Sequence, residues 1–134
     1  MRKKFAMMGL TLAGLIGCTP ATMQSLRSNP AAQVRFETAQ NYQSVYRTVI
    51  TSARRCYNQA PLLVQGDLFS DIKSAEVTVA WTTAIGGHDV HMGIDIKAIN
   101  DGLTEVRIYT AKSSESAPKT VRSWIENDAT SCTS

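Results

Sequence analysis

The sequence predicts an α+β domain in which one helix precedes an antiparallel meander of three or four strands and a second helix follows it. Three observations support this prediction. Apolar residues recur every three or four positions between residues 41 and 60, every second position between 75 and 111, and every three or four positions again after 118. Each element therefore has one apolar face. We expect a two-layer sandwich, in the order α-β-β-β-α, with both helices packed on one face of the sheet.

The first helix is expected over residues 41–59. Its apolar positions form a continuous stripe, its opposite face is polar, and Pro61 ends it. Cys56 lies on the apolar stripe near the end of this helix.

The second helix is expected over residues 116–128. Ser116 is a suitable capping residue, and Pro118 suits the first helical turn. Trp124 lies on the apolar stripe of this helix and is expected in the core, as is Trp81 in the preceding sheet.

Three strands are expected over residues 75–83, 89–100 and 103–111, because each of these segments alternates apolar and polar residues. The segment 62–72 is ambiguous. It is interpreted as a short edge strand around Gly66-Asp67.

The turns predict the register of the strands. A two-residue Gly86-Gly87 loop pairs apolar residues on one face: Val77 with Ile96, Val79 with Ile94, and Trp81 with Met92. For the next hairpin, a two-residue Asp101-Gly102 loop would mix apolar and charged residues. A three-residue loop over 100–102, with Gly102 left-handed, keeps the faces separate and is preferred.

The same register pairs charges on the outer face of the sheet. Lys97 would lie between Glu76 and Glu105, and Asp95 would lie opposite Arg107. Ion pairing across the strands is therefore preferred over a catalytic pair of carboxylates as the interpretation of these acids.

The N-terminal segment, MRKKFAMMGLTLAGLIGC, has the layout of a secretory signal peptide. Three cations precede an uncharged, mainly apolar run from Phe5 to Ile16, and Gly17 and Cys18 follow it. This run of about a dozen residues is shorter than the roughly 20 that a membrane-spanning helix needs. The last four residues, Leu15-Ile16-Gly17-Cys18, resemble the lipobox of bacterial lipoproteins.

The lipobox resemblance implies that the sulfur of Cys18 receives a diacylglyceryl group and that residues 1–17 are removed as the signal peptide. It usually implies a third acyl chain, such as palmitate, on the new N-terminus. Residues 18–39 are rich in Ser, Thr, Ala, Gln and Pro and are interpreted as a lipidated tether, which leaves 40–134 as a single domain.

The residue after Cys18 bears on the location. Lipoproteins of this kind with Thr rather than Asp after the lipidated cysteine resemble those sorted to the outer membrane of Gram-negative bacteria, and Thr19 fits this pattern. In a Gram-positive host the anchor would hold the protein on the outer face of the plasma membrane. The expected location is the cell outer membrane, with the periplasmic or surface side left open.

The charge of the exported chain argues against nucleic acid as a partner. Of the 14 Lys and Arg residues, three belong to the signal peptide, so the remaining eleven equal the 11 Asp and Glu residues. A chain without net positive charge lacks the electrostatic footprint of a nucleic-acid-binding protein.

The cysteines left after lipidation, Cys56 and Cys132, are expected to form a disulfide, as an even pair does in most exported proteins. The alternative, a reactive Cys56 nucleophile, has no histidine or acid fixed beside it in the sequence.

The histidines form one cluster, His88-Asp89-Val90-His91, beside the Gly-Gly turn. Two or three of its polar side chains could meet a divalent cation, but zinc needs three or four protein ligands and no further ligand follows at a diagnostic spacing. Solvated side chains are the preferred interpretation, and no metal or cofactor is predicted. The candidate binding residues are His88, Asp89, His91, Lys97 and Arg107.

No phosphate-binding loop, dinucleotide-binding glycine pattern, nucleophile elbow or H-E-x-x-H motif occurs in the sequence. The leading hypothesis is therefore a non-enzymatic, lipid-anchored interaction or structural module that contacts another component of the cell envelope. The alternatives are a small-ligand or metal-binding lipoprotein that uses residues 88–91 and, third, an envelope hydrolase.

Overall fold

The computed structural model describes residues 21–113 and 116–133 of the chain. In this part, five strands form one antiparallel sheet in the order β1-β5-β4-β3-β2. The elements in chain order are α1 (Met23–Ser28), β1 (Ala32–Thr38), α2 (Tyr42–Tyr57), β2 (Leu62–Phe69), β3 (Ser74–Thr82), β4 (His88–Asn100), β5 (Leu103–Thr110) and α3 (Ser116–Glu126).

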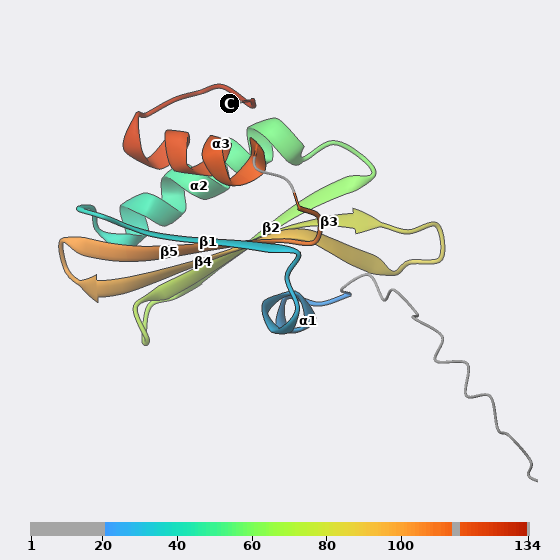
Figure 1. Cartoon of the computed structure of the whole chain (residues 1–134), viewed down its shortest axis with the longest axis horizontal. Helices are drawn as coiled ribbons and strands as arrows, with labels where there is room; N and C mark the ends of the chain where they lie inside the picture. The colour runs from blue at the N-terminus through green and yellow to red at the C-terminus, as the bar shows by residue number, and fades with distance from the viewer. Residues whose placement is uncertain (1–20, 114–115, 134) are drawn as a thin grey trace, which may run out of the picture.

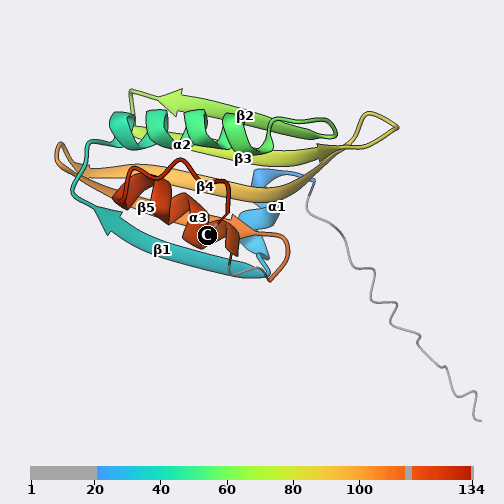
Figure 2. The same ribbon diagram turned by 90° about the horizontal axis from the view of Figure 1, so that it is seen from above.

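The helices lie on both faces of the sheet. Figure 1 shows α2 and α3 together on one face and the short α1 on the other. Seen from above, α2 runs over β2 and β3, and α3 lies over the half that contains β5 and β1 (Figure 2). The predicted α+β class, the antiparallel meander and the two helices on one face are confirmed. The strand count is wrong, because the sheet has five strands, and the third helix was not expected.

The interpretation of residues 18–39 as a tether is wrong over its described part, because this segment forms α1 and β1. In β1 the apolar Val34 and Phe36 turn toward the core, and the alternate residues 33, 35 and 37 are exposed. The period-two signal was present, but it is short, and β1 pairs with β5, which lies some seventy residues later in the chain. The domain therefore begins before residue 40.

The short helix α1 is fixed by two apolar side chains and a cap. The hydroxyl of Thr22 accepts a hydrogen bond from the Ser25 amide, and Met23 and Leu26 are buried against the sheet. The helix approaches β4 at Gly93, where an added Cβ would lie 2.0 Å from Sδ of Met23. A glycine at this position therefore leaves room for the helix.

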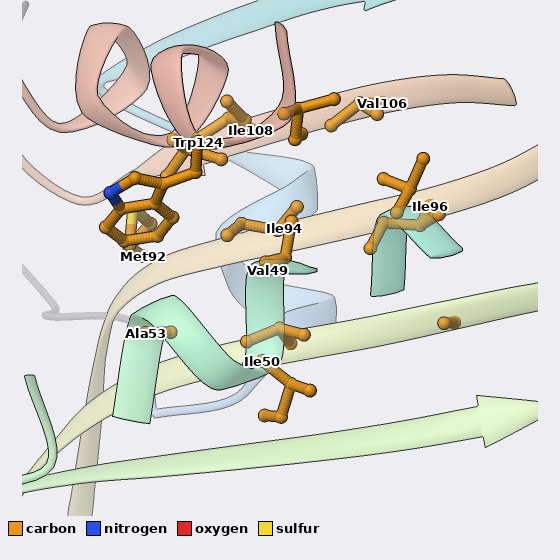
Figure 3. Close-up of a cluster of buried hydrophobic side chains, with 14 of the residues drawn as sticks. Val49, Ile50, Ala53, Met92, Ile94, Ile96, Val106, Ile108 and Trp124 are labelled. Carbon is orange, nitrogen blue, oxygen red and sulfur yellow. The ribbon is translucent and has the colours of Figure 1, made fainter. Parts of the chain in front are cut away.

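The main core lies between the sheet and the two helices α2 and α3. Trp124 from α3 is its largest fully buried side chain, 1% exposed, and its indole N–H donates to the Ser131 carbonyl oxygen at 2.8 Å. Figure 3 shows the other layers of this core, contributed by Val49, Ile50 and Ala53 of α2, Met92, Ile94 and Ile96 of β4, and Val106 and Ile108 of β5.

The predicted disulfide is present. Cys56 in the last turn of α2 is bonded to Cys132 in the C-terminal tail, with their Cα atoms 5.3 Å apart. The bond fastens the tail that follows α3 to α2. In the same region, the Tyr57 and Trp124 rings lie 6.1 Å apart.

The predicted register of β4 and β5 is confirmed, but the turn that produces it is different. Ile96 lies opposite Val106, and Asn100 lies opposite Leu103, so the turn itself has two residues. A bulge between Ala98 and Asn100 shifts the register by one residue and keeps the apolar faces aligned. Gly102 is not left-handed; Gly86 is the described glycine with a positive φ, 82°.

The predicted register of β3 and β4 is wrong by two residues. Val77 lies opposite Ile94 and Val79 opposite Met92, because a five-residue turn shifts the pairing by three residues and a bulge in β4 restores one. Thr83 closes this turn: its amide donates to the Gly87 carbonyl oxygen, and its hydroxyl accepts from the Gly87 amide, both at 2.8 Å. A shift of two residues leaves every side chain on its original face, so alternation alone cannot detect it.

Two further predictions for these strands are also wrong. Trp81 lies opposite Asp89, not Met92, and is 40% exposed instead of buried in the core. Glu76 lies opposite Asp95, not Lys97, so two carboxylates face each other across β3 and β4.

Candidate functional site

An apolar cleft of about 250 Å³ lies at the end of the sheet from which the β3–β4 hairpin projects. It lies on the face covered by α2 and α3, because Val79 and Met92 of its lining also belong to the main core. All of the elements from α2 to α3 contribute, through Tyr57, Leu62, Val79, Trp81, His91, Met92, Thr110, Lys112 and Ala117.

A bulge in β4 positions the imidazole in this cleft. Val79 lies opposite Met92, whereas Ala80 lies opposite Val90, so His91 is the extra residue. The bulge reverses the alternation of side chains, so that Val90 packs under α1 on one face while His91 joins the cleft on the other. The His91 ring then lies 5.6 Å from the Trp81 ring, tilted by 55°.

The electrostatics of the cleft favour an uncharged His91. Burial lowers the pKa of His91, the positive charge of Lys112 lowers it further, and Asp89 opposes these effects in part. The imidazole is therefore neutral at neutral pH, and Lys112 supplies the positive charge. Burial also raises the pKa of Tyr57, which keeps its phenol protonated.

The cleft is suited to binding an apolar group. Among its described lining residues there is no carboxylate, cysteine or serine, and the polar groups are two hydroxyls, one imidazole, one indole N–H and one ammonium. Such a set can orient a ligand by hydrogen bonds and attract an anion to Lys112.

The structure separates the predicted cluster at residues 88–91. His91 lines the cleft, His88 is exposed at the start of β4, and Asp89 lies opposite Trp81. No three His, Cys, Asp or Glu side chains of the described chain come together as a metal site would require.

Lys97 and Arg107, the other candidate binding residues, lie on the opposite face of the sheet. As predicted, Lys97 lies opposite Glu105 and Arg107 lies opposite Asp95. Nε of Arg107 donates to Glu105 at 2.7 Å, and Arg35 of β1 also pairs with Glu105. Burial alone would raise the pKa of Glu105, but these two guanidinium groups outweigh it and hold the pKa below its usual range.

Sequence reasoning missed Arg27, which binds the two facing carboxylates. It forms a bidentate pair with Asp95, at 2.8 Å from Nε and 2.6 Å from Nη2, and also pairs with Glu76. Hydrogen bonds to Asp95 are the largest cause of a raised pKa for this guanidinium. Nothing near Arg27 in the sequence indicates this role, because both partners lie at least 49 positions away.

A second hollow, lined mainly by polar residues, lies between α2 and the C-terminal tail. Arg47 and Arg55 line it together with Asp128. Arg55 donates to the Thr130 carbonyl oxygen at 3.0 Å and to the Ser52 hydroxyl at 3.4 Å, so it holds the tail. We assign this hollow a structural role.

Cys18, the predicted site of lipidation, lies outside the described residues. Among the described helices, none has both the length and the apolar character of a membrane span.

Comparisons with protein-family models, with characterised proteins and with solved structures find no match for this chain.

Proposed function

We propose that this protein is a lipid-anchored protein of the cell outer membrane that works as a non-enzymatic binding module, with the apolar cleft as its binding site. The lipobox and Thr19 support the location. The observation that carries the function is the cleft, in which apolar walls lie beside an indole that is 40% exposed. Exposed aromatic residues beside an apolar pocket are typical of interaction sites.

The size of the cleft favours a protein partner over a free small molecule. A volume of about 250 Å³ lies just under the range of about 300–1,000 Å³ that is usual for small-molecule sites. One large apolar side chain of an envelope protein would fill it, and Trp81 would cover that side chain. Lys112 on the lining adds a preference for an acidic group beside the apolar one.

The polar groups of the cleft support binding over catalysis. His91 is neutral, as a general base must be, but no carboxylate, serine or cysteine stands beside it among the described lining residues. The same side chains are suited to donating hydrogen bonds to a bound peptide.

Site-specific photo-crosslinking in cells tests the proposal. A benzophenone amino acid replaces Leu62, which lines the cleft, or Gln65, which is exposed on the same strand β2. We expect a protein adduct from position 62 only, and its loss in the variant Ala117→Phe, whose ring occupies the cleft. A small mass increase in place of a protein adduct would indicate a free ligand, and equal labelling from both positions would refute the cleft as the site.

The anchor is tested separately. Replacing Cys18 by Ala removes the sulfur that the lipobox resemblance marks for lipidation, so the variant should leave the membrane pellet and appear in the soluble envelope fraction. Unchanged pelleting would contradict the anchor but would leave the cleft proposal intact.

A further inference from the structure

The tip of the β3–β4 hairpin is an exposed, uncharged turn. Residues 83–87 read Thr-Ala-Ile-Gly-Gly, and the side chain of Ile85 at the tip is 96% exposed. Both views show this hairpin projecting beyond the body of the domain (Figures 1 and 2). An isoleucine held in water at the end of a projecting hairpin adds nothing to the core, so its burial elsewhere would be favourable.

The described chain begins beside this same hairpin. Met23 of α1 packs in one cluster with Ala80 of β3 and Val90 of β4, which form the base of the hairpin. In Figures 1 and 2 the segment that leads into α1 lies next to that base. Cys18 is four positions before Thr22, and a chain of this length can carry its Sγ at most about 14–16 Å from the helix cap.

The reach of the hairpin matches this distance. Ile85 lies five residues beyond Ala80, two of them in β3 and three in the turn, so the tip lies at most about 17 Å from Ala80. A lipid on Cys18 would therefore bring the bilayer surface to within the reach of the hairpin tip.

We propose that Ile85 and the uncharged turn around it insert into the interface of the membrane that carries the anchor. This inference rests on the proposed lipidation of Cys18. The lipid then holds the protein on the membrane, and the hairpin fixes its orientation, with the base of the hairpin and the cleft directed toward the bilayer surface. Apolar side chains that enter the boundary between headgroups and acyl chains make this type of contact.

The other end of the sheet provides a contrast. Ile72, in the turn between β2 and β3, is 66% exposed, but Asp71 and Lys73 flank it and Lys73 pairs with Asp101 of the neighbouring turn. Charged groups at a turn oppose entry into a bilayer. The nine residues of β3 separate this turn from the hairpin tip.

Fluorescent labelling of the lipidated protein in phosphatidylethanolamine–phosphatidylglycerol vesicles tests the inference. The variants Ile85→Cys and Ile72→Cys each carry one environment-sensitive dye, because Cys56 and Cys132 are already joined in the disulfide. We expect a blue-shifted emission and about fivefold weaker quenching by aqueous iodide at position 85, but water-like values at position 72.

The outcomes separate the inference from the anchor on which it rests. Equal quenching at both positions, with the protein still bound to the vesicles, overturns the inserted hairpin and leaves the anchor standing. Failure of both labelled proteins to bind vesicles overturns the anchor itself. A third variant, Ile85→Asp, should remain bound through its lipid, and a dye on residue 84 in that background should return to water-like emission.

Discussion

Arg27 is expected to be the surface residue whose charge contributes most to the stability of the domain. It lies between Glu76 and Asp95, which face each other across β3 and β4, and it binds both. We therefore consider Arg27→Met, which keeps most of the apolar stem and removes the guanidinium. The change deletes three charge-assisted contacts and leaves two carboxylates opposite each other.

The magnitude follows from exposure and distance. Hydrogen bonds to charged groups contribute about 1.5–3 kcal/mol when buried, and exposed ion pairs about 0–1 kcal/mol. The three side chains are about a quarter to a third exposed, so we assign about 1–1.5 kcal/mol to the contacts. Carboxylates about 5 Å apart on facing strands repel by about 1 kcal/mol at a dielectric constant of about 60–80.

The expected loss for Arg27→Met is therefore about 2–2.5 kcal/mol in the free energy of unfolding, or about 8–10 °C in the unfolding midpoint of a domain of this size. Urea unfolding of the exported chain with Cys18→Ser measures it. In the background Glu76→Gln with Asp95→Asn, the same change should cost under about 1 kcal/mol. Arg122→Met, which removes an exposed pair within α3 and the contact of the guanidinium with the Phe36 ring at 5.0 Å, is the control and should cost about 1 kcal/mol.

Two results would refute this reasoning. Arg27→Met could leave the free energy of unfolding within about 0.5 kcal/mol of the parent, which would show that α1 does not hold the acids together. The loss could also be the same with and without the carboxylates, which would place the effect in packing and contradict the facing positions of Glu76 and Asp95.

Three further predictions follow from single features of the fold. Asp128 follows α3 with φ at 50°, so Asp128→Gly should raise the free energy of unfolding by about 0.5–1 kcal/mol in urea titrations, and an unchanged or lower value would contradict strain at this position. The pKa of His91 is lowered in the fold, so its contribution to stability is complete above pH 6.5 and is lost as the pH falls through the lowered value. His91→Gln should therefore flatten the curve of stability against pH in that window. An unchanged curve would contradict the lowered pKa of His91. The disulfide between Cys56 and Cys132 closes a loop over 76 positions, so the double serine variant should lose about 4 kcal/mol in calorimetry, and a loss under 1 kcal/mol would be inconsistent with a native bridge.

The β4–β5 hairpin shows how much local pattern can determine. Alternation fixed which residues face the core, and a one-residue slip would have exposed Ile96. Charge pairing of Lys97 with Glu105 agreed with that choice, so the register was predictable. The bulge at residue 99 was not, because two different turns give the same pairing beyond it.

The β3–β4 hairpin shows where such a pattern stops. Registers that differ by two residues place the same side chains on the same faces, so alternation does not distinguish them. Here the features that distinguish them are the closure of the turn by Thr83, the bulge at His91 and the guanidinium of Arg27. The candidate site depends on this pairing, because the bulge turns His91 to the face that carries Trp81 and places the two rings 5.6 Å apart.

The sequence by itself determined the α+β class, the disulfide pair and the expectation of a lipid anchor. These follow from the periods of apolar residues, from the two cysteines that remain after lipidation and from the lipobox pattern, each of which can be recognised without the fold. The tertiary structure decided the pairing of β1 with β5, the docking of α1 through Arg27 and the assembly of the cleft. Each of these joins residues that lie far apart in the chain, and their free energy depends on packing and charge placement that no short segment contains.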